Sequence, residues 1–536
     1  MTIGSPGRCD SVRNRPTILT EPMRKTLILV LLVALALAAI PANAGPDREP
    51  NGPDGPTEFR LFGAGFGHGL GLSQWGAYGL AKQGWGPSKI LKHFYSGTRV
   101  ARDGSPPKDL RIGLAQGKDS VRLEAQAGPV EIRLGDAQTG SAVATIPPGE
   151  TWKVRAAGNQ YLIVDATGTT VDSVGGPNDA ISVVYEQNGA RVRVPEAAHT
   201  YNRGSIEFGL YSCAGGCVMR LVLTVDPQGY LYGLGEVPSS WPMSALKTQA
   251  IAARTYAFTK AAASQHRAVC DCALYASSFD QVYAGWDKEG GADGDRWVAA
   301  VNQTEDQVVL NGAETIQAFY MSSSGGYTEN NENVWGGTPI DYLRGVCDPG
   351  DYTSENPNAV WEQTFTPAQV TQHLGLGIGT VTGFTNVDRG VSGRIMSVTV
   401  IGANGQAAIS GDALRSHLGL PDDRLWINAD RRITGEIRAK YDGLGCSPGL
   451  PTSRQVSVAG GERQKFEEGT IYDSGSAGAH FLRGLVLGRY LSKGGPAGHL
   501  GFPTSDVHKL ENGNLRASFE GGVITCDADG SSCRVA

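Results

Sequence analysis

One glutamate lies in the stretch of this chain whose residue types best suit acid–base chemistry. Glu236 is part of the loop GLGEVPSSWP at residues 233–242, which glycine and proline stiffen, and a helical pattern follows it directly. Apolar neighbours such as Val237 and Trp241 desolvate a carboxylate and raise its pKa, as a general acid near neutral pH requires. The sequence therefore predicts a general acid at Glu236. The alternative is an ordinary solvated or helix-capping glutamate.

A helix predicted over residues 242–263 must hold this loop in place. Ser239 or Ser240 suits its N-cap, and Pro242 suits its first turn. Small apolar residues recur along it at helical spacing and predict one closely packed face: Leu246, Ala250, Ala253 and Ala257. We therefore expect a rigid support behind Glu236.

Three other segments are rich in polar and aromatic residues, and two of them also contain several glycines. Residues 65–77 read GFGHGLGLSQWGA, residues 280–283 read DQVY, and residues 320–335 read YMSSSGGYTENNENVW. Together with the glutamate loop, these segments are similar to the signatures of the stage II sporulation protein D family, the SpoIID/LytB domain of bacterial cell-wall proteins. The resemblance extends roughly over residues 62–350.

Known members of this family include lytic transglycosylases. The resemblance implies that the chain cleaves the MurNAc–GlcNAc glycosidic bond of peptidoglycan to give 1,6-anhydro-MurNAc ends, with Glu236 as the single acid and base. One carboxyl suffices because the sugar's own 6-hydroxyl attacks intramolecularly, at a high effective concentration. No cofactor is expected. The alternative is a non-catalytic cell-wall-binding protein or an activator of an N-acetylmuramoyl-L-alanine amidase, because other members are described as amidase modifiers.

The resemblance also implies which residues contact the glycan strand. We expect the substrate-binding residues to be His68, Ser73, Gln74, Gln281, Tyr283, Ser323, Ser324 and Gly325. For His68 and Ser73 the alternative is a structural role in tight turns. A serine-hydrolase triad is disfavoured because the serines before Gly325 lack a Gly-x-Ser-x-Gly elbow.

The order of the segments departs from the family pattern. In typical members the glycine-histidine-glycine segment follows the other signatures, whereas here residues 65–77 come first. A circular permutation explains such an order, because chain termini often lie close together at the surface. We expect residues 65–77 to join the same cleft as Glu236.

A cluster of possible metal ligands follows the predicted helix. His266, Cys270 and Cys272 are weak zinc candidates, and some relatives hold zinc near this region. Asp280 stands where those relatives have a cysteine, and the Cys-x-Cys spacing is unusual for a zinc site. We therefore expect these cysteines to form disulfides, with Cys347 or Cys446 as partners.

Composition limits the remaining choices. The chain has 536 residues and a net charge of -6, so we expect two or three domains and no nucleic-acid partner. With 74 glycines and 28 prolines, short strands and turns are favoured over a helical bundle. The predicted fold class is α+β: mostly antiparallel β-structure with a few helices flanking a substrate cleft, plus a C-terminal β-rich repeat module.

The N-terminal region has the features of a targeting segment. Residues 1–44 comprise an upstream stretch and, from Met23, a basic start, a short apolar run and a small-residue cleavage site. This pattern predicts a signal peptide, with translation starting at Met1 or Met23, and a secreted protein of the cell wall or cell surface without a membrane span. Residues 45–58 are expected to be a linker. Eight cysteines remain after cleavage, and Cys213–Cys217 and Cys526–Cys533 are expected pairs.

The last hundred residues contain an internal repeat. The word LPTS at residues 450–453, followed by KFEEG from 465, recurs as GFPTS at 501–505, followed by SFEGG from 518. These words resemble the LGFP repeat of actinobacterial envelope proteins, which is thought to bind the cell wall. We therefore divide the chain into a SpoIID/LytB-like domain at 59–435 and LGFP-type repeats at 436–536, whose partner would be a cell-wall polymer. The alternative is a small structural repeat without a ligand.

Overall fold

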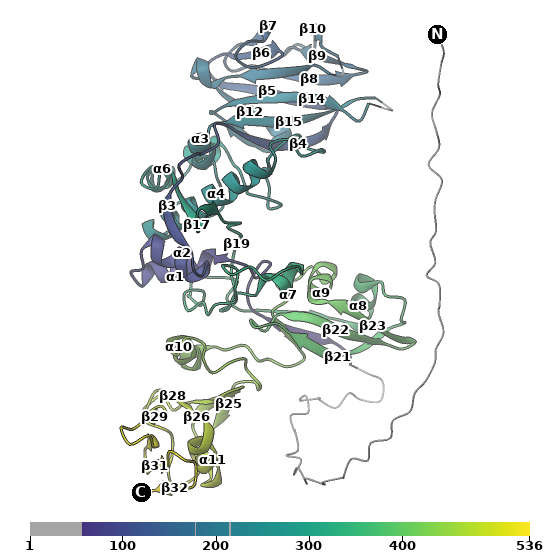
Figure 1. Cartoon of the computed structure of the whole chain (residues 1–536). Coiled ribbons are helices and arrows are strands. Elements are labelled where there is room, and N and C mark those ends of the chain that lie inside the picture. The colour runs from purple at the N-terminus through teal and green to yellow at the C-terminus, as the bar shows by residue number, and fades with distance from the viewer. Residues whose placement is uncertain (1–55, 177, 214–215) are drawn as a thin grey trace, which may run out of the picture. The chain divides into compact units, whose positions relative to one another are not determined.

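The computed structural model describes residues 56–176, 178–213 and 216–536 (Figure 1). The predicted leader at 1–44 and most of the predicted linker at 45–58 lie outside the described residues. The predicted fold class is confirmed, because the sheets are mostly antiparallel, helices accompany them, and the C-terminal region is β-rich. Among the described helices, none combines the length and the apolar character needed to cross a bilayer.

Two large sheets are built from strands between Leu110 and Tyr275, and both contribute to one hydrophobic core. The seven-stranded sheet contains, in order, β16 (Leu274–Tyr275), β4 (Leu110–Lys118), β15 (Val218–Val225), β14 (Ser205–Tyr211), β11 (Ala180–Val184), β6 (Val130–Leu134) and β7 (Ser141–Ile146). The six-stranded sheet contains β10 (Thr170–Val174), β9 (Gln160–Val164), β8 (Thr151–Ala157), β5 (Ser120–Ala127), β12 (Arg191–Val194) and β13 (His199–Tyr201).

The helical part of the domain follows the sheets and is organised around α4 (Met243–Ala263). The predicted small-residue face of this helix is completely buried. The N-cap is Pro242 and no side chain caps the helix, so the predicted cap at Ser239 or Ser240 is wrong. The neighbouring elements are α1 (Gln74–Lys82), α2 (Pro87–Phe94), α3 (Pro227–Tyr232), α5 (Trp286–Glu289), α6 (Gly294–Asn302), α7 (Asn331–Trp335), β3 (Arg99–Arg102), β17 (Gln307–Asn311) and β18 (Glu314–Thr315).

Two segments far apart in sequence pair directly beside this helical part. β2 (Leu72–Ser73) and β19 (Tyr320–Met321) form a short parallel ladder. An isolated bridge between Phe66 and Ser323 extends the contact. The early glycine-rich segment is therefore held against the segment that begins at residue 320.

A second, smaller core forms from both ends of the predicted domain. The N-terminal strand β1 (Phe59–Gly63) pairs with two strands from the other end of the domain, β20 (Trp361–Phe365) and β24 (Leu425–Ile427). The remaining elements around this core are β21 (Val381–Arg389), β22 (Ile395–Gly402), β23 (Gly405–Ser410), α8 (Pro367–Leu374) and α9 (Gly411–Leu418).

The C-terminal region contains two copies of one unit, each a helix followed by a four-stranded sheet. In the first copy Tyr441 stacks on Phe466 at 5.3 Å, and in the second Tyr490 stacks on Phe519 at 4.7 Å. The first copy contains α10 (Gly435–Gly443), β25 (Val456–Val458), β26 (Gly461–Phe466), β27 (Gly469–Asp473) and β28 (Ala479–Leu482). The second contains α11 (Gly484–Ser492), β29 (His508–Lys509), β30 (Leu515–Phe519), β31 (Gly522–Cys526) and β32 (Cys533–Val535).

The described residues contain four disulfides, and two of them match the predicted pairs Cys213–Cys217 and Cys526–Cys533. The expectation that Cys270 or Cys272 pairs with Cys347 or Cys446 is wrong. Cys270 bonds to Cys272, and Cys347 bonds to Cys446. The turn between Cys270 and Cys272 brings the two sulfurs together, which the spacing alone does not predict.

The Cys347–Cys446 bond should contribute most to stability, because it closes the longest loop, with 99 residues of separation. Replacing both cysteines by serine should lower the free energy of unfolding by about 2–5 kcal/mol in a denaturant titration. The matched control is the double serine variant of Cys213 and Cys217, whose separation is 4 residues and whose loss should be smaller. Equal losses in the two variants would contradict this ranking.

Candidate functional site

The loop that carries Glu236 connects α3 to α4 and is fixed by backbone pairing along one side. Gly235 donates to the carbonyl of Val282 at 2.8 Å, and Ala284 donates to the carbonyl of Gly233 at 2.8 Å. The bonds run in both directions between residues 233–235 and residues 282–284, as in a short strand ladder, and they use only main-chain groups. The position of Glu236 is therefore set by the backbone rather than by side-chain packing alone.

Two cationic side chains hold the other side of the loop. Arg296 donates to the carbonyls of Ser239 and Trp241, both at 3.0 Å. Lys288 donates from Nζ to the carbonyl of Val237 at 2.5 Å. Loop carbonyls that would otherwise need water are satisfied by these cations, so the loop keeps one conformation close to the half-buried Glu236.

The carboxyl group of Glu236 is surrounded by hydrogen-bond donors. The backbone N–H of Val282 donates to Oε1 at 2.6 Å, and the side chains of Gln74 and Tyr320 present further donors that favour the ionised carboxyl. Burial raises the pKa of Glu236 above its ordinary value, and these hydrogen bonds and the charge of Lys288 oppose that rise. The site thus favours the protonated acid and still offers donors to the carboxylate.

Tyr320 is itself held by a buried amide. Its hydroxyl accepts a hydrogen bond from Nε2 of Gln281 at 2.9 Å. Gln281 is oriented in turn by Tyr230, which donates to its Oε1 at 2.9 Å, and by the carbonyl of Ala253, which accepts from Nε2 at 3.2 Å. Burial and the nearby charge of Glu236 raise the pKa of Tyr320 well above 10, so the phenol keeps its proton.

The early glycine-rich segment reaches this site through Gln74, as the sequence predicts for residues 65–77. Gln74 is the first residue of α1, and Ser73 caps that helix by accepting from the N–H of Gly76 at 3.0 Å. Nε2 of Gln74 donates to Oε1 of Gln249 on α4 at 3.4 Å. Segments about 160 residues apart in sequence therefore supply two groups of one site.

His68 contributes to the site indirectly. Its Nδ1 accepts from the N–H of Leu70 at 3.1 Å, so its Nε2–H donates to the carbonyl of Tyr320 at 3.1 Å. Burial, with a smaller contribution from Arg394, lowers the pKa of His68 to about 4. The imidazole is therefore neutral near pH 7, and both of its nitrogens hydrogen-bond backbone groups. His68 thus positions Tyr320 and has no nitrogen left to bind a sugar.

The predicted glycan contacts of three serines are wrong. Ser73 and Ser323 donate to Asp351 at 3.0 and 2.9 Å, and Ser324 donates to Asp348 at 2.6 Å. All three are completely buried and have no surface to offer a glycan. Their hydroxyls solvate two buried carboxyl groups, which cannot remain in the interior without such partners.

Three other predicted contacts are also buried and support the site from behind. Gln281 has no exposed surface and acts on Tyr320, as described above. Tyr283 is 2% exposed and stacks on Tyr230 at 5.2 Å. Gly325 is buried in a backbone conformation with φ of 68°, against the main chain of Ala64. These residues do not line a substrate surface.

The weak zinc candidates do not form a set of metal ligands. Cys270 and Cys272 are joined in a disulfide, and Nδ1 of His266 lies 2.7 Å from a carboxylate oxygen of Asp271. Asp280, which stands where relatives have a cysteine, pairs instead with Arg267 at 2.9 Å. Both cysteines are therefore in a disulfide, as expected in kind if not in partner, and Asp280 takes part in a salt bridge.

Sequence reasoning missed several residues of this site. Tyr320 and Trp335 lie within residues 320–335, one of the segments that carry the resemblance. Their position in that segment could have identified them as candidate site residues. Trp335 is 55% exposed, and its ring packs on the rings of His68 at 5.1 Å and Phe319 at 4.6 Å. Nothing in the sequence pointed to Lys288, because its partner is the backbone carbonyl of Val237 and every residue has a backbone carbonyl.

The comparisons with known proteins confirm the resemblance in two parts of the chain. Residues 218–310, which contain Glu236, match the family model described as SpoIID, Stage II sporulation protein. Residues 449–498 match the model of the LGFP repeat. The second match begins within the first C-terminal copy and ends within the second.

Curated relatives agree with the first of these matches. The chain is 29% identical over 274 residues to Stage II sporulation protein D of Bacillus subtilis (strain 168), a match that covers 47% of this chain and 74% of that protein. It is 28% identical over 240 residues to Stage II sporulation protein D of Bacillus amyloliquefaciens, covering 43% of this chain and 67% of that protein. It is 34% identical over 135 residues to the Amidase enhancer of Bacillus subtilis, covering 25% of this chain and 16% of that protein.

The raised pKa of Glu236 should make the protein less stable as the pH rises. In the window between its ordinary pKa and its folded pKa, the folded state binds more protons than the unfolded state, so the free energy of unfolding falls with pH. Glu236→Gln removes this loss, and the variant should gain stability over wild type by up to about 1.4 kcal/mol per pH unit across that window.

Denaturant titrations at several pH values measure this difference. Glu511→Gln, which neutralises an exposed carboxylate, is the control and should run parallel to wild type. A Glu236→Gln curve that also runs parallel to wild type would show that Glu236 is not desolvated.

Proposed function

We propose that this chain is a peptidoglycan lytic transglycosylase that uses Glu236 as its only acid and base. The observation that carries the proposal is a desolvated carboxyl group with three hydrogen-bond donors around it. The similarity to Stage II sporulation protein D supports the same reading, because SpoIID proteins are lytic transglycosylase-like.

In the proposed reaction Glu236 acts first as an acid. Its raised pKa keeps the proton available near neutral pH, and the carboxyl gives it to the glycosidic oxygen as the bond from the anomeric carbon breaks. The 6-hydroxyl of the same MurNAc then attacks the anomeric carbon and passes its proton to the Glu236 carboxylate. A new C1–O6 bond replaces the glycosidic bond, no water is consumed, and the acid is regenerated.

The hydrogen-bond donors around the carboxyl would stabilise the Glu236 anion during this reaction. Between the two proton transfers Glu236 is an anion in an apolar site, which is unfavourable unless its oxygens are hydrogen-bonded. Val282, Gln74 and Tyr320 provide those bonds, and Lys288 adds a positive charge close by. Because Gln281 already holds the Tyr320 hydroxyl and Gln249 holds the Gln74 amide, little reorganisation accompanies the charge change.

A second candidate function is activation of a muramoyl-alanine amidase without glycan cleavage. It is favoured by one observation, the similarity to a protein named Amidase enhancer, although that match covers only 16% of the relative. An activator needs the fold but not a protonated glutamate. The two candidates therefore differ in whether Glu236 is required.

The chain is also proposed to act at the cell wall, outside the cell. The SpoIID match and the LGFP repeats support cell-wall association, and the predicted leader supports export. The repeats would raise the local concentration of the catalytic domain on its polymer.

Glu236→Gln should lose about 10²–10⁴-fold of the rate of glycan cleavage, because the amide cannot donate and regain a proton while it still accepts from Val282. The measurement is mass spectrometry of products released from purified peptidoglycan. Wild type should give 1,6-anhydro-MurNAc ends, and Glu511→Gln should match it. Anhydro products from Glu236→Gln at the wild-type rate would exclude the mechanism, and none from wild type would favour the activator.

Lys288 should set the alkaline limit of activity. Its charge lowers the pKa of Glu236, so Lys288→Met should raise that pKa and move the alkaline limb of the rate–pH profile to higher pH. Lys288→Arg keeps the charge and should leave the limb near its original position. Burial also lowers the pKa of Lys288 itself to about 8, so the effect should be largest below that pH. A limb that moves to lower pH in Lys288→Met would contradict this assignment.

A further inference from the structure

Two buried carboxyl groups, those of Asp348 and Asp351, have no part in the proposed reaction. At most 1% of either residue is exposed, so neither can contact a substrate. Both lie in one loop, residues 348–356, which we call the aspartate loop. A buried carboxyl group is unfavourable unless it is hydrogen-bonded, so the partners of these two groups show what the loop holds together.

Asp351 joins two segments that are far apart in sequence. Its Oδ1 accepts from Oγ of Ser73 at 3.0 Å and from the backbone N–H of Ser324 at 3.1 Å. Its Oδ2 accepts from Oγ of Ser323 at 2.9 Å. Ser73 and Ser324 are 251 residues apart, and the N–H of Ser324 also reaches Oγ of Ser73 at 3.2 Å. One carboxyl group thus links the N-cap of α1 to the segment that follows β19.

Each of these two segments carries a side-chain donor for Glu236. Gln74 follows Ser73 directly, and Tyr320 precedes Ser323 by three residues. Both donors favour the ionised form of the Glu236 carboxyl. Because so few residues separate each donor from its serine, a shift of either serine must move the donor next to it.

The aspartate loop is itself held firmly against both segments. Nδ2 of Asn356 donates to the carbonyl of Asp351 at 2.7 Å and to Oγ of Ser323 at 3.2 Å. On the other side, a Cβ atom built on Gly76 of α1 would lie only 2.3 Å from Oδ2 of Asp348. No side chain therefore fits between the first turn of α1 and the loop, and the two move together.

The charged groups that face Asp351 are Asp348 and Arg438 of α10. Burial and the charge of Asp351 raise the pKa of Asp348, so Asp348 keeps its proton near neutral pH. Burial also raises the pKa of Asp351, but the hydrogen bond from Ser323 and the charge of Arg438 oppose that rise. Asp351 is therefore the carboxylate of the pair, and the three donors described above converge on it.

We propose that Asp351 is a positioning residue of the acid–base centre: through Ser73 and Ser323 it fixes the two side-chain donors against Glu236. The inference rests on the proposed function, because this role matters to catalysis only if Glu236 passes through an anion. Without Asp351 the donors move away from the carboxyl, so the anion is less stable and the acid holds its proton more tightly. A residue needed only for folding would lower stability and leave the titration of Glu236 unchanged.

The test measures cleavage of soluble glycan oligomers by three variants of the full chain over a range of pH. Asp351→Asn keeps the size of the side chain but removes the charge and one acceptor, and Ser73→Ala and Ser323→Ala each remove one link. In Asp351→Asn the KM should be unchanged and kcat should fall about tenfold. The alkaline limb of the rate–pH profile should move up by about one pH unit, which corresponds to tenfold weaker stabilisation of the anion. Each serine variant should show a smaller change in the same direction.

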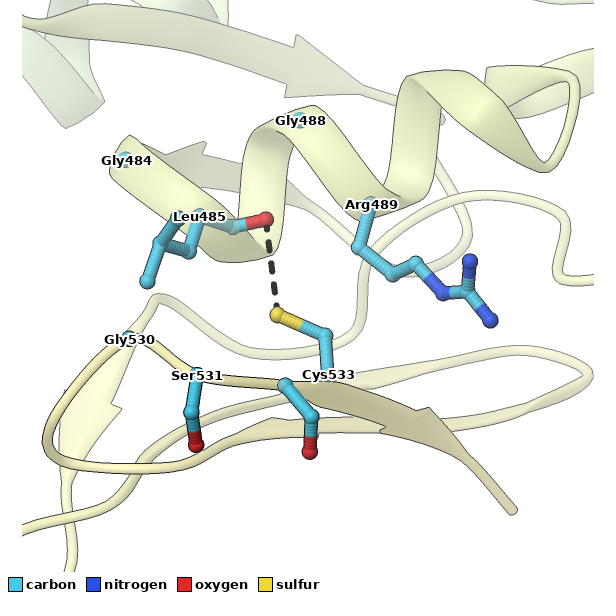
Figure 2. Close-up of a pocket in the computed structure, with 8 residues that line it drawn as sticks. Gly484, Leu485, Gly488, Arg489, Gly530, Ser531 and Cys533 are labelled. Atoms are coloured by element: carbon cyan, nitrogen blue, oxygen red, sulfur yellow. Dashed lines mark hydrogen bonds between the residues drawn. The ribbon is translucent and has the colours of Figure 1, made fainter.

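Ser392→Ala is the matched control. Ser392 is completely buried and donates to the buried carboxylate of Glu329 at 2.6 Å, but neither side chain bonds residues 73–76 or 320–326. This variant should lose stability and keep the alkaline limb of wild type. Ser531→Ala removes an exposed hydroxyl at the open hollow between α11 and the hairpin that ends in β32 (Figure 2), and it should match wild type in every measurement.

A second readout does not depend on catalysis. Each variant is combined with Glu236→Gln, and the difference in free energy of unfolding with and without that substitution is followed against pH. Because the folded-state pKa of Glu236 rises further when its donors move, the difference should keep growing to higher pH. In the Asp351→Asn background it should level off about one pH unit above the wild-type value.

The two readouts separate this proposal from the proposed function. If Asp351→Asn does not fold, the two serine variants decide, and a titration of Glu236 like that in Ser392→Ala would overturn the positioning role. An unchanged titration in Asp351→Asn would overturn it as well. If wild type releases no anhydro ends but the stability difference still shifts in Asp351→Asn, the reaction is rejected and the hold of Asp351 on the donors stands.

Discussion

The burial of one carboxyl group is the constraint on which the rest of this site depends. In the proposed reaction a desolvated Glu236 can work only if its anion is stabilised between the two proton transfers. That requirement explains why a backbone N–H, an amide and a phenol converge on it. It also explains why further residues hold these donors, because each donor must be in place before the charge on Glu236 forms. Gln281 holds Tyr320 by its hydroxyl and His68 holds it by its carbonyl.

The unusual order of the segments has little effect on this arrangement. The parallel ladder between β2 and β19 joins residues 72–73 to residues 320–321 directly. Gln74 therefore arrives beside Glu236 through pairing and not through chain continuity. At the same time β1 closes a sheet with β20 and β24 from the far end of the domain. The N-terminal segment is thus fixed at two places, as the circular permutation predicted from the sequence would require.

The sequence predicted well those features that depend on local pattern. The glycine and proline content predicted short, mostly antiparallel strands, helical spacing predicted α4, and repeated words predicted the two C-terminal copies. Glu236 was found because its loop and helix are continuous in sequence.

The failures have a common physical origin. Ser323 and Ser324 read as a hydroxyl-rich surface loop, but their partners Asp348 and Asp351 lie some 25 residues further on and draw them into the interior. Whether a hydroxyl faces a ligand or a buried carboxylate depends on tertiary contacts that spacing does not encode. The pairing of Cys347 with Cys446 likewise depends on tertiary contacts, because the two cysteines are 99 residues apart in sequence.

The two C-terminal copies show how one scaffold can serve two purposes. In the first copy Cys446 is bonded to Cys347, and α10 packs its Ile437 and Tyr441 into a core that also includes Tyr327. Its cation Lys440 is committed to Asp506, which lies in the second copy. The first helix is therefore a joint between the repeats and the preceding domain. The helix of the second copy packs its Val486 and Tyr490 into a different core, which includes Phe519 and Ile524 of its own sheet.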